Sequence, residues 1–338
     1  MTTPTLLIVS IDTEEDNWQP RRDGVTVDNI RELPGLDALF QGLGVRATYF
    51  TTYQVAICDW AAAILRELHG AGAELGAHLH PWNTPPLDEP FLPRNTMLKN
   101  LPAALQLAKL ERLTAALREA FGGRPVAFRA GRYGLGPDTI TALIRCGYAV
   151  DSSVTPFVSW EEYDDGPTFI GAPLHAYRLA GGADVRIPQP GGALLELPLS
   201  LGYNRPPSRA WAGVYRALST AALRPLHLRG IASRAGILKR IALSPETASV
   251  ADMLRLSRRL IDAGVGYLHL VLHSPTLRPG LSPFAPDRAS VERMYRAIAS
   301  YVEGVSRVTP LRCVTVSEAA TLLDTAQSPE LVAAASRS

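Results

Sequence analysis

The sequence has few cysteines and no long apolar run. Its three cysteines, Cys58, Cys146 and Cys313, are far apart and show no CxxC spacing. Neither a disulfide framework nor a cysteine-based metal site is therefore expected. No apolar run approaches the roughly 18 residues that a membrane span needs. The N-terminal segment lacks a basic region, and its apolar run is too short for a secretion signal. We therefore expect a reduced, cytoplasmic protein without a membrane span.

An excess of charge of one sign is also missing. Among 338 residues, 34 basic side chains nearly balance 32 acidic ones, and the net charge is +2. This balance removes the electrostatic case for a nucleic-acid partner. Basic residues thicken only within 205–259, where they alternate with apolar residues. We interpret this stretch as a solvated helical face; the alternative is peripheral contact with an anionic or lipid-linked substrate.

Strand-like and helix-like segments alternate along the chain. The apolar run 5–11 predicts a strand buried on both faces, and 45–52 predicts a second strand. About seven or eight strand–helix units indicate a distorted (β/α) barrel, in which the loops that follow the strands share one face. We predict one domain over 1–326, with an insertion or cap within 157–265. The tail, 327–338, is expected to be loosely ordered.

Further elements are expected from hydrophobic periodicity and from glycine or capping signals. They are a helix that carries Leu107 to Phe121 on one side, a strand at 194–200, a helix over 249–262, a strand at 267–272, and a strand at 313–316 with a helix from about Ser317.

Ionisable side chains follow five of the predicted strands, and the first strand runs into the acidic segment Asp12-Thr13-Glu14-Glu15-Asp16. Asp12 and Glu14 are two residues apart in an extended segment, so their side chains point to the same side. Two neighbouring carboxylates repel each other unless a cation or a shared proton lies between them. The alternative is a helix N-terminus, where acidic residues cap the backbone.

A second group of candidate ligands is the pair His78 and His80. Their i, i+2 spacing places both imidazoles on one side of an extended segment, and imidazole is a common ligand for zinc. Together with the acidic segment they predict a site for a divalent metal ion, with zinc as the expected ion. One carboxylate would bind the metal and the other would act as a base. Trp82, after Pro81, is expected to form an aromatic wall for the substrate.

Hydrolysis by an activated water needs an acid for the leaving group as well as a base. His273, at the end of the run 267–272, is the expected acid, whereas His269 within that run is expected to be a core histidine. Arg129 and Arg132 could pair with the base carboxylate or with Asp151. The alternative for them is an ordinary structural ion pair.

In this order the motifs resemble those of the polysaccharide deacetylase family, the NodB-homology group of carbohydrate esterases. The resemblance covers residues 5–320 and rests on five segments: SIDTEEDNW, GAHLHPW, FRAGRYG, DSSVTP and VLHSP. It implies a NodB-type barrel with Asp12 as base, with Glu14, His78 and His80 as metal ligands, and with His273 as acid.

The resemblance also implies roles for residues around these groups. Arg129 would orient the base, Asp151 would be a tuning partner, and Leu272 would contact the acyl group of the substrate. Arg132 and Tyr133 of the FRAGRYG segment are further candidates for substrate contacts.

Two departures from the family pattern concern the metal ligands. The DTEED segment replaces the more common Asp-Asp, so the acidic ligand could be Glu14, Glu15 or Asp16. With Glu14 as the ligand, Glu15 and Asp16 are expected to be helix-start acids. The two histidines are usually four residues apart, and here the spacing is two residues shorter.

The activity implied by the resemblance is metal-dependent removal of an N-acetyl group from an amino sugar, in a glycoconjugate or in a nucleotide- or lipid-linked sugar. The alternatives are a cyclic-imide or amide hydrolase or a deformylase on the same fold. From another class, the alternative is a catalytically inactive sugar-binding barrel.

Overall fold

The computed structural model describes residues 4–205, 211, 213 and 238–327. Its main feature is a nine-stranded sheet, in which all neighbouring strands are parallel except one antiparallel pair, β6 and β7. The strands are β1 (Thr5–Thr13), β2 (Thr48–Thr51), β3 (Glu74–Leu79), β4 (Ala127–Ala130), β5 (Val150–Asp151), β6 (Tyr177–Leu179), β7 (Leu194–Glu196), β10 (Tyr267–His273) and β11 (Leu311–Val314).

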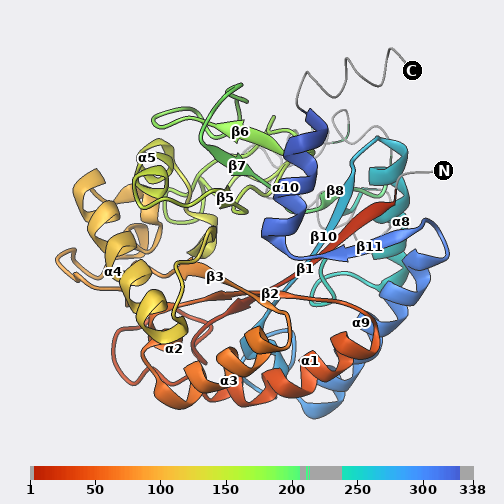
Figure 1. Cartoon of the computed structure of the whole chain (residues 1–338), viewed down its shortest axis with the longest axis horizontal. Helices are drawn as coiled ribbons and strands as arrows, with labels where there is room; N and C mark the ends of the chain where they lie inside the picture. Colours follow the sequence, from red (N-terminus) through yellow and green to blue (C-terminus); the bar gives the residue numbers. More distant parts are fainter. Residues whose placement is uncertain (1–3, 206–210, 212, 214–237, 328–338) are drawn as a thin grey trace, which may run out of the picture.

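The order of the strands is β10-β1-β2-β3-β4-β5-β7-β6, and β11 pairs with the first half of β1. The sheet curls around its own axis, as Figure 1 shows. The fold is therefore the distorted (β/α) barrel that the sequence predicts. A separate two-stranded ribbon consists of β8 (Leu201–Tyr203) and β9 (Arg240–Ala242).

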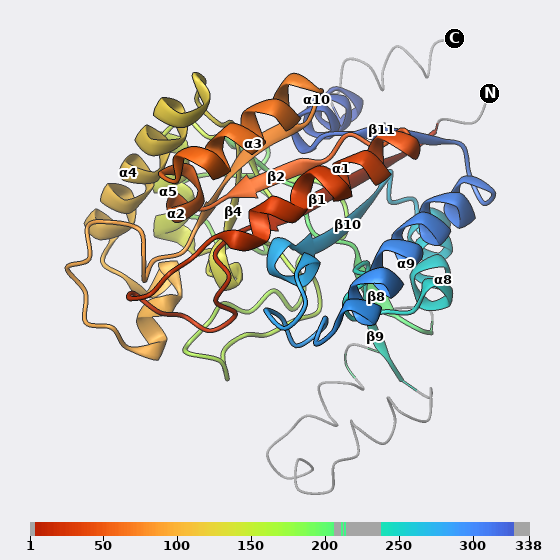
Figure 2. The same ribbon diagram turned by 90° about the horizontal axis from the view of Figure 1, so that it is seen from below.

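Helices cover the outer side of the sheet. In Figures 1 and 2, α1 and α3 lie along β1 and β2, α4 and α5 lie together at one end, and α8 and α9 lie together near β10. The helices are α1 (Leu33–Gly42), α2 (Tyr53–Ala56), α3 (Asp59–Gly70), α4 (Ala103–Phe121), α5 (Pro137–Arg145), α8 (Val250–Asp262), α9 (Arg288–Ser306) and α10 (Val316–Gln327).

Local signals in the sequence explain where these elements begin and end. All nine residues of β1 are buried, as expected for a strand with helices on one side and the barrel interior on the other. The predicted helix over 249–262 is confirmed, because the Ser249 hydroxyl accepts a hydrogen bond from the Asp252 amide and caps α8. Helix α4 ends at Gly122, which has a φ of 74°.

Several strands differ in length from the prediction. The strand expected over 45–52 is paired only at Thr48–Thr51, and the one expected over 194–200 only at Leu194–Glu196. Pro198 has no N–H to donate to a ladder, so β7 ends before it. The last strand lies at Leu311–Val314 rather than 313–316, and α10 already begins at Val316.

Part of the region predicted to be an insertion contributes to the main sheet, because β6 and β7 lie within 157–265. Much of the basic stretch 205–259 and nearly all of the tail at 327–338 lie outside the described residues. The boundaries of the single domain therefore stay a prediction. Among the described residues, no helix combines the length and the apolar composition that crossing a membrane would take.

The pairing register of the strands brings the predicted site residues to the same edge of the sheet. Asp12 at the end of β1 lies opposite His273 at the end of β10. Two strands further along the sheet, His78 in β3 lies opposite Arg129 in β4. Because parallel strands end at the same edge, residues more than 250 positions apart in the sequence meet in one cleft.

Candidate active site

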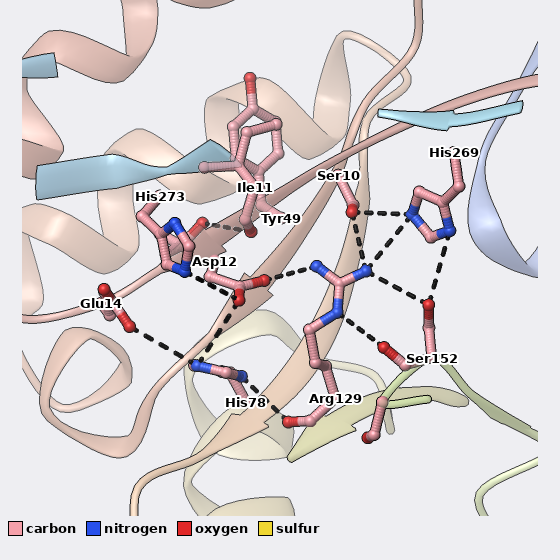
Figure 3. A network of polar contacts seen from close by, with 12 residues as sticks. Ser10, Ile11, Asp12, Glu14, Tyr49, His78, Arg129, Ser152, His269 and His273 are labelled. Atoms are coloured by element: carbon pink, nitrogen blue, oxygen red, sulfur yellow. Dashed lines mark hydrogen bonds and ion pairs between the residues drawn. The ribbon is translucent and has the colours of Figure 1, made fainter. Parts of the chain in front are cut away.

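A cleft of about 290 Å³ lies at this edge of the barrel. Six of the predicted site residues meet at it or just beneath it, as Figure 3 shows for most of them: Asp12, Glu14, His78, His80, Arg129 and His273. The lining is mixed, with carboxylates and imidazoles at the base and aromatic rings around them: Asp12, Glu14, Asn17, Trp18, Gln19, Pro20, His78, His80, Trp82, Met97, Arg132, Tyr133, Trp160, Tyr163 and His273.

Three side chains converge as a possible set of metal ligands. Nε2 of His78 and Nε2 of His80 are 3.1 Å apart, and Oε2 of Glu14 lies 3.6 Å from the former and 3.2 Å from the latter. A tetrahedral ion with ligand bonds of about 2.1 Å holds its donor atoms about 3.4 Å apart. The observed separations are therefore close to those around a tetrahedral metal ion.

The hydrogen bonds of the two histidines explain why these nitrogens need a cation. Nδ1 of His78 lies 3.0 Å from the carbonyl oxygen of Arg129, and Nδ1 of His80 lies 2.7 Å from Oε2 of Glu15. Both partners are acceptors, so each Nδ1 carries a proton, and the two Nε2 atoms are left facing each other and Glu14. Two lone pairs 3.1 Å apart repel unless a proton or a metal ion lies between them.

The electrostatics of His80 and Glu14 point the same way. Burial opposes a charge on His80, yet the carboxylates of Glu15 and Glu14 raise its pKa to about 10. Burial would likewise raise the pKa of Glu14, but hydrogen bonds from His78 and His80 bring it well below its ordinary value. The site thus stabilises positive charge at the point where the three donor atoms meet.

Asp12 lies next to these donors and is held by Arg129. A guanidinium nitrogen of Arg129 donates to Oδ1 of Asp12 at 2.5 Å. The other oxygen, Oδ2, lies 4.0 Å from Nε2 of His78 and 3.7 Å from Nε2 of His273. Burial, the largest single effect, raises the pKa of Asp12, but Arg129, His78 and His273 together outweigh it, and the net pKa is lowered. Asp12 is therefore an ionised carboxylate with one oxygen free toward the cleft.

Arg129 is fully buried and its orientation is fixed on several sides. It donates to the Ser152 carbonyl at 2.8 Å and to the Ser10 hydroxyl at 2.9 Å, and its guanidinium lies 4.4 Å from the centre of the Phe50 ring. His269 contacts the same Ser10 hydroxyl at 2.8 Å, as Figure 3 shows. The pKa of His269 is well below its ordinary value because of burial and of Arg129, so His269 is a neutral core histidine, as predicted.

One ring nitrogen of His273 faces the cleft, and the other faces a carboxylate. Its Nδ1 lies 2.9 Å from Oε2 of Glu246, whose Oε1 accepts from the His273 amide at 3.0 Å. Burial opposes the charged imidazole, but Glu246, Glu14 and Asp12 raise the pKa of His273 to about 10. His273 is thus a protonated imidazole beside Asp12.

Glu246 was not found by sequence reasoning. It lies between β9 and α8, in a loop that follows neither a strand of the main sheet nor a recognisable motif. The position of Glu246 becomes apparent only from its contacts in the structure. Besides His273, Thr276 donates to its Oε1 at 2.6 Å.

The predicted substrate-contact residues Trp82, Arg132 and Tyr133 line the cleft. The Trp82 ring stacks on His80 with 4.2 Å between centres, and Tyr133 stacks on Trp160 at 5.3 Å. Arg132 forms an ion pair with Asp164 at 2.7 Å instead of pairing with Asp12 or Asp151. Arg132 and Tyr133 both adopt positive φ, 52° and 58°, which turns this segment sharply into the cleft.

Two predicted site residues lie elsewhere. Leu272 is fully buried in the apolar core, because side chains alternate along β10 and His273 is the one that faces the cleft. Asp151 is also fully buried and forms a hydrogen bond with Glu196 on β7, so it contacts neither His273 nor Asp12.

The expectation that Glu15 and Asp16 begin a helix is wrong. The chain forms an irregular loop from Glu14 to Val27. Glu15 contacts His80, and Asp16 accepts hydrogen bonds from Thr26 and from the amides of Asp28 and Asn29. A carboxylate in a compact loop can satisfy backbone amides as it does at a helix start, which is why the pattern misled.

Comparisons with known proteins identify the fold. No protein-family model matches the chain, and no curated protein matches it. A provisionally named polysaccharide deacetylase from Mycobacterium smegmatis is 19% identical with a TM-score of 0.53, over 97% of this chain and 93% of that one. The chitin deacetylase of Colletotrichum lindemuthianum is 14% identical with a TM-score of 0.41, over 94% and 88%.

A third solved structure is the Xyl-CE4 domain of a multidomain xylanase from the hindgut metagenome of Trinervitermes trinervoides. It is 12% identical with a TM-score of 0.44, over 94% of this chain and 89% of that one. The likeness to the mycobacterial structure, which extends over nearly the full length of both chains, carries the assignment. This chain therefore has the fold of the polysaccharide deacetylases.

Proposed function

We propose that this protein is a metal-dependent hydrolase that removes an N-acetyl group from an amino sugar, with Glu14, His78 and His80 as ligands of a zinc ion. The observation that carries the proposal is the convergence of these three donor atoms within 4.8 Å of one another, beside an ionised carboxylate and a protonated imidazole. The fold of the polysaccharide deacetylases supports the same activity.

Charge balance also supports a divalent ion. Asp12, Glu14 and Glu15 bring three negative charges to the base of the cleft, and Arg129 neutralises one of them. His273 is already paired with Glu246. A double positive charge among the ligands would balance the remaining two carboxylates, as the low dielectric of a buried site demands.

A zinc ion at these ligands would polarise the amide carbonyl and lower the pKa of a water molecule. Asp12 would accept a proton from a water molecule in the cleft through Oδ2, because Arg129 holds Oδ1 and keeps the carboxylate in one orientation. As the proton moves to Asp12, the water oxygen forms its bond to the carbonyl carbon.

His273 acts on the other half of the reaction. Its Nε2 faces Asp12 at 3.7 Å, and Glu246 holds the opposite side of the ring. When the C–N bond breaks, His273 donates the Nε2 proton to the departing nitrogen. Acetate and a free amine are the products. The water oxygen ends in acetate, and the proton taken up by Asp12 later returns to solvent.

The walls of the cleft fit a sugar ring. Trp18, Trp82, Tyr133, Trp160 and Tyr163 line the space above the candidate ligands. Aromatic faces offer broad apolar contact at small cost in side-chain entropy, and a few polar groups at the base then set the orientation. We propose a glycoconjugate or a nucleotide- or lipid-linked amino sugar as the substrate class. The cytoplasmic location predicted from the sequence stays a prediction.

Metal analysis of the purified protein, combined with acetate release before and after chelation, tests the proposal. The expected result is about one equivalent of bound zinc, with activity that chelation removes and added zinc restores. A metal-free protein that binds an amino sugar without changing it would contradict the proposal and would favour an inactive sugar-binding barrel.

A screen of N-acetylated, N-formylated and O-acetylated sugar conjugates, together with cyclic imides, then identifies the reacting bond. Free amine with acetate is the expected product pair. Formate release or opening of a cyclic imide would instead favour a deformylase or a cyclic-imide hydrolase on the same site.

A further inference from the structure

We propose that Glu15 is a positioning residue of the metal site: its carboxylate holds His80 with the Nε2 lone pair directed at Glu14 and His78. This inference rests on the proposed metal site and adds a residue that the sequence had assigned to a helix start. It concerns the metal ligands and not the substrate, since Glu15 does not line the cleft.

The contact between Glu15 and His80 is short and buried. Oε2 of Glu15 lies 2.7 Å from Nδ1 of His80, and the exposed fractions of the two side chains are 4% and 7%. At such burial the hydrogen bond is shielded from bulk solvent, and one partner is ionised, which makes the bond stronger than a neutral one. Nδ1 is thereby fixed as the protonated nitrogen, so Nε2 must be the donor to a metal.

The position of His80 explains why a side chain is needed there. His78 lies within β3, and its Nδ1 bonds to a backbone carbonyl of the neighbouring strand, that of Arg129. His80 lies one residue beyond the end of β3, where the ladder with β4 has stopped. In place of a ladder carbonyl, Glu15 supplies the acceptor from the loop after β1.

Packing fixes the plane of the His80 ring, and Glu15 fixes its direction. Trp82 stacks on the ring at 4.2 Å with 22° between the planes. The backbone of Gly131 lies so close that a Cβ there would come within 2.5 Å of Cδ2 of His80. Contacts of this kind tolerate a ring flipped by 180°, whereas the hydrogen bond to Glu15 does not, because the flip would turn Cδ2 instead of Nδ1 toward the carboxylate.

The charge of Glu15 acts mainly on His80. Its other oxygen, Oε1, is buried and has no hydrogen-bond partner among the described residues. An anionic acceptor behind a ligating histidine raises the basicity of the ligand and orients it, and losing such a group costs about 10–100-fold in metal affinity. Glu15 should therefore contribute affinity as well as orientation.

The affinity for zinc, measured by competition with a chromophoric chelator, tests this inference. We expect Glu15→Gln to bind zinc about 10–100-fold more weakly than the natural protein. Glu15→Asp, which keeps the charge, should bind more tightly than Glu15→Gln. The matched control is Asp16→Asn, because the neighbouring carboxylate bonds to Thr26 and Asn29 rather than to His80; its zinc affinity should be unchanged.

The outcomes separate the inference from the proposed function. If the natural protein binds no zinc, the proposed metal site itself fails. If the natural protein binds zinc and Glu15→Gln binds it equally well, the site stands and the role of Glu15 is overturned. Near-ultraviolet circular dichroism checks folding; should Glu15→Gln not fold, Glu15→Ser, which leaves room for water, replaces it with the same expected loss.

Discussion

The acidic residues that follow β1 differ in their partners, although they are neighbours in the sequence. Asp12 is held by Arg129, Glu14 faces His78 and His80, and Glu15 bonds to the far side of His80. Within β1, successive side chains point to opposite faces of the sheet, so Asp12 and Thr13 point apart. Beyond the end of the strand, the path of the loop sets the direction of each side chain. The pKa of each of the three carboxyl groups is lowered, but their different partners suit them to different roles.

The first prediction concerns Asp12 as the base. Asp12→Asn should lower kcat by a factor of about 10²–10⁴, since an amide cannot accept the proton of the water. Zinc should stay bound, because the donor atoms belong to Glu14 and the two histidines. Steady-state kinetics and metal content of the same preparation measure both effects.

Glu14→Gln is the matched variant for that experiment. It should lose zinc and activity together, because an amide oxygen carries no charge to offset the cation. If Asp12→Asn loses zinc while Glu14→Gln retains it, the roles of the two carboxylates are reversed.

A second prediction concerns Glu246 and the pH dependence of activity. His273 must be protonated to act as an acid, and Glu246 is the leading cause of its raised pKa after the opposing effect of burial. Glu246→Gln keeps an acceptor for the imidazole but removes the charge, so the pKa of His273 falls. We expect the alkaline limb of the profile of kcat against pH to move to lower pH.

Asp252→Asn is the control for Glu246→Gln. Asp252 lies on α8 and is ion-paired to Lys239 and Arg255 and not to His273. Its alkaline limb should match that of the natural protein. An unchanged limb in Glu246→Gln would show that His273 is not the acid that this limb reports.

The strand ends themselves could be predicted, but their partners could not. Asp12, His78, Arg129 and His273 follow or end apolar runs, and parallel strands bring such positions together. Glu246 escaped prediction because its position depends on a loop that returns to β10 from the β8–β9 ribbon.

At the scale of elements, the loop after β3 is tied to helix α4. Lys109 of α4 is fully buried and donates to the carbonyls of Pro81, Thr84 and Pro86 at 2.9, 2.8 and 2.5 Å. It also forms an ion pair with Glu89 at 3.1 Å. One ammonium group thus satisfies the polar backbone of the segment that carries the aromatic wall next to His80.

The third prediction follows from this anchor. Lys109→Met should lower the free energy of unfolding by about 1–3 kcal/mol, since three carbonyls would lose a buried donor, although Glu89 would keep its ion pair with Arg22. Urea unfolding followed by circular dichroism measures the change. A loss below about 1 kcal/mol would contradict the anchor.

Element boundaries were predictable where a local signal marks them. Ser249 before α8 and Gly122 after α4 are such signals. The short strands β5 and β6 have two and three residues, and they exist only because neighbouring strands pair with them. No periodicity can show in so few residues, so their pairing lies beyond what the sequence alone reveals.

At the scale of the whole molecule, the barrel has a second buried pair of carboxyl groups, away from the cleft. Asp151 of β5 and Glu196 of β7 lie opposite each other in the sheet, and both are fully buried. Burial is the main cause that raises the pKa of each, and for Glu196 the charge of Asp151 raises it further. Their hydrogen bond requires one shared proton.

The last prediction is a loss of stability at alkaline pH that this pair causes. The folded protein holds a proton on Glu196 that the unfolded chain releases near the ordinary value of 4.5. The stabilisation is therefore complete below that pH and declines as the pH rises toward the higher pKa of the folded state, by up to about 1.4 kcal/mol per pH unit. Glu196→Gln needs no shared proton, so its free energy of unfolding should depend less on pH. Urea unfolding between pH 5 and 9, with the exposed Glu119→Gln as control, measures the difference. Parallel curves for the natural protein and Glu196→Gln would mean that the pair does not share a proton.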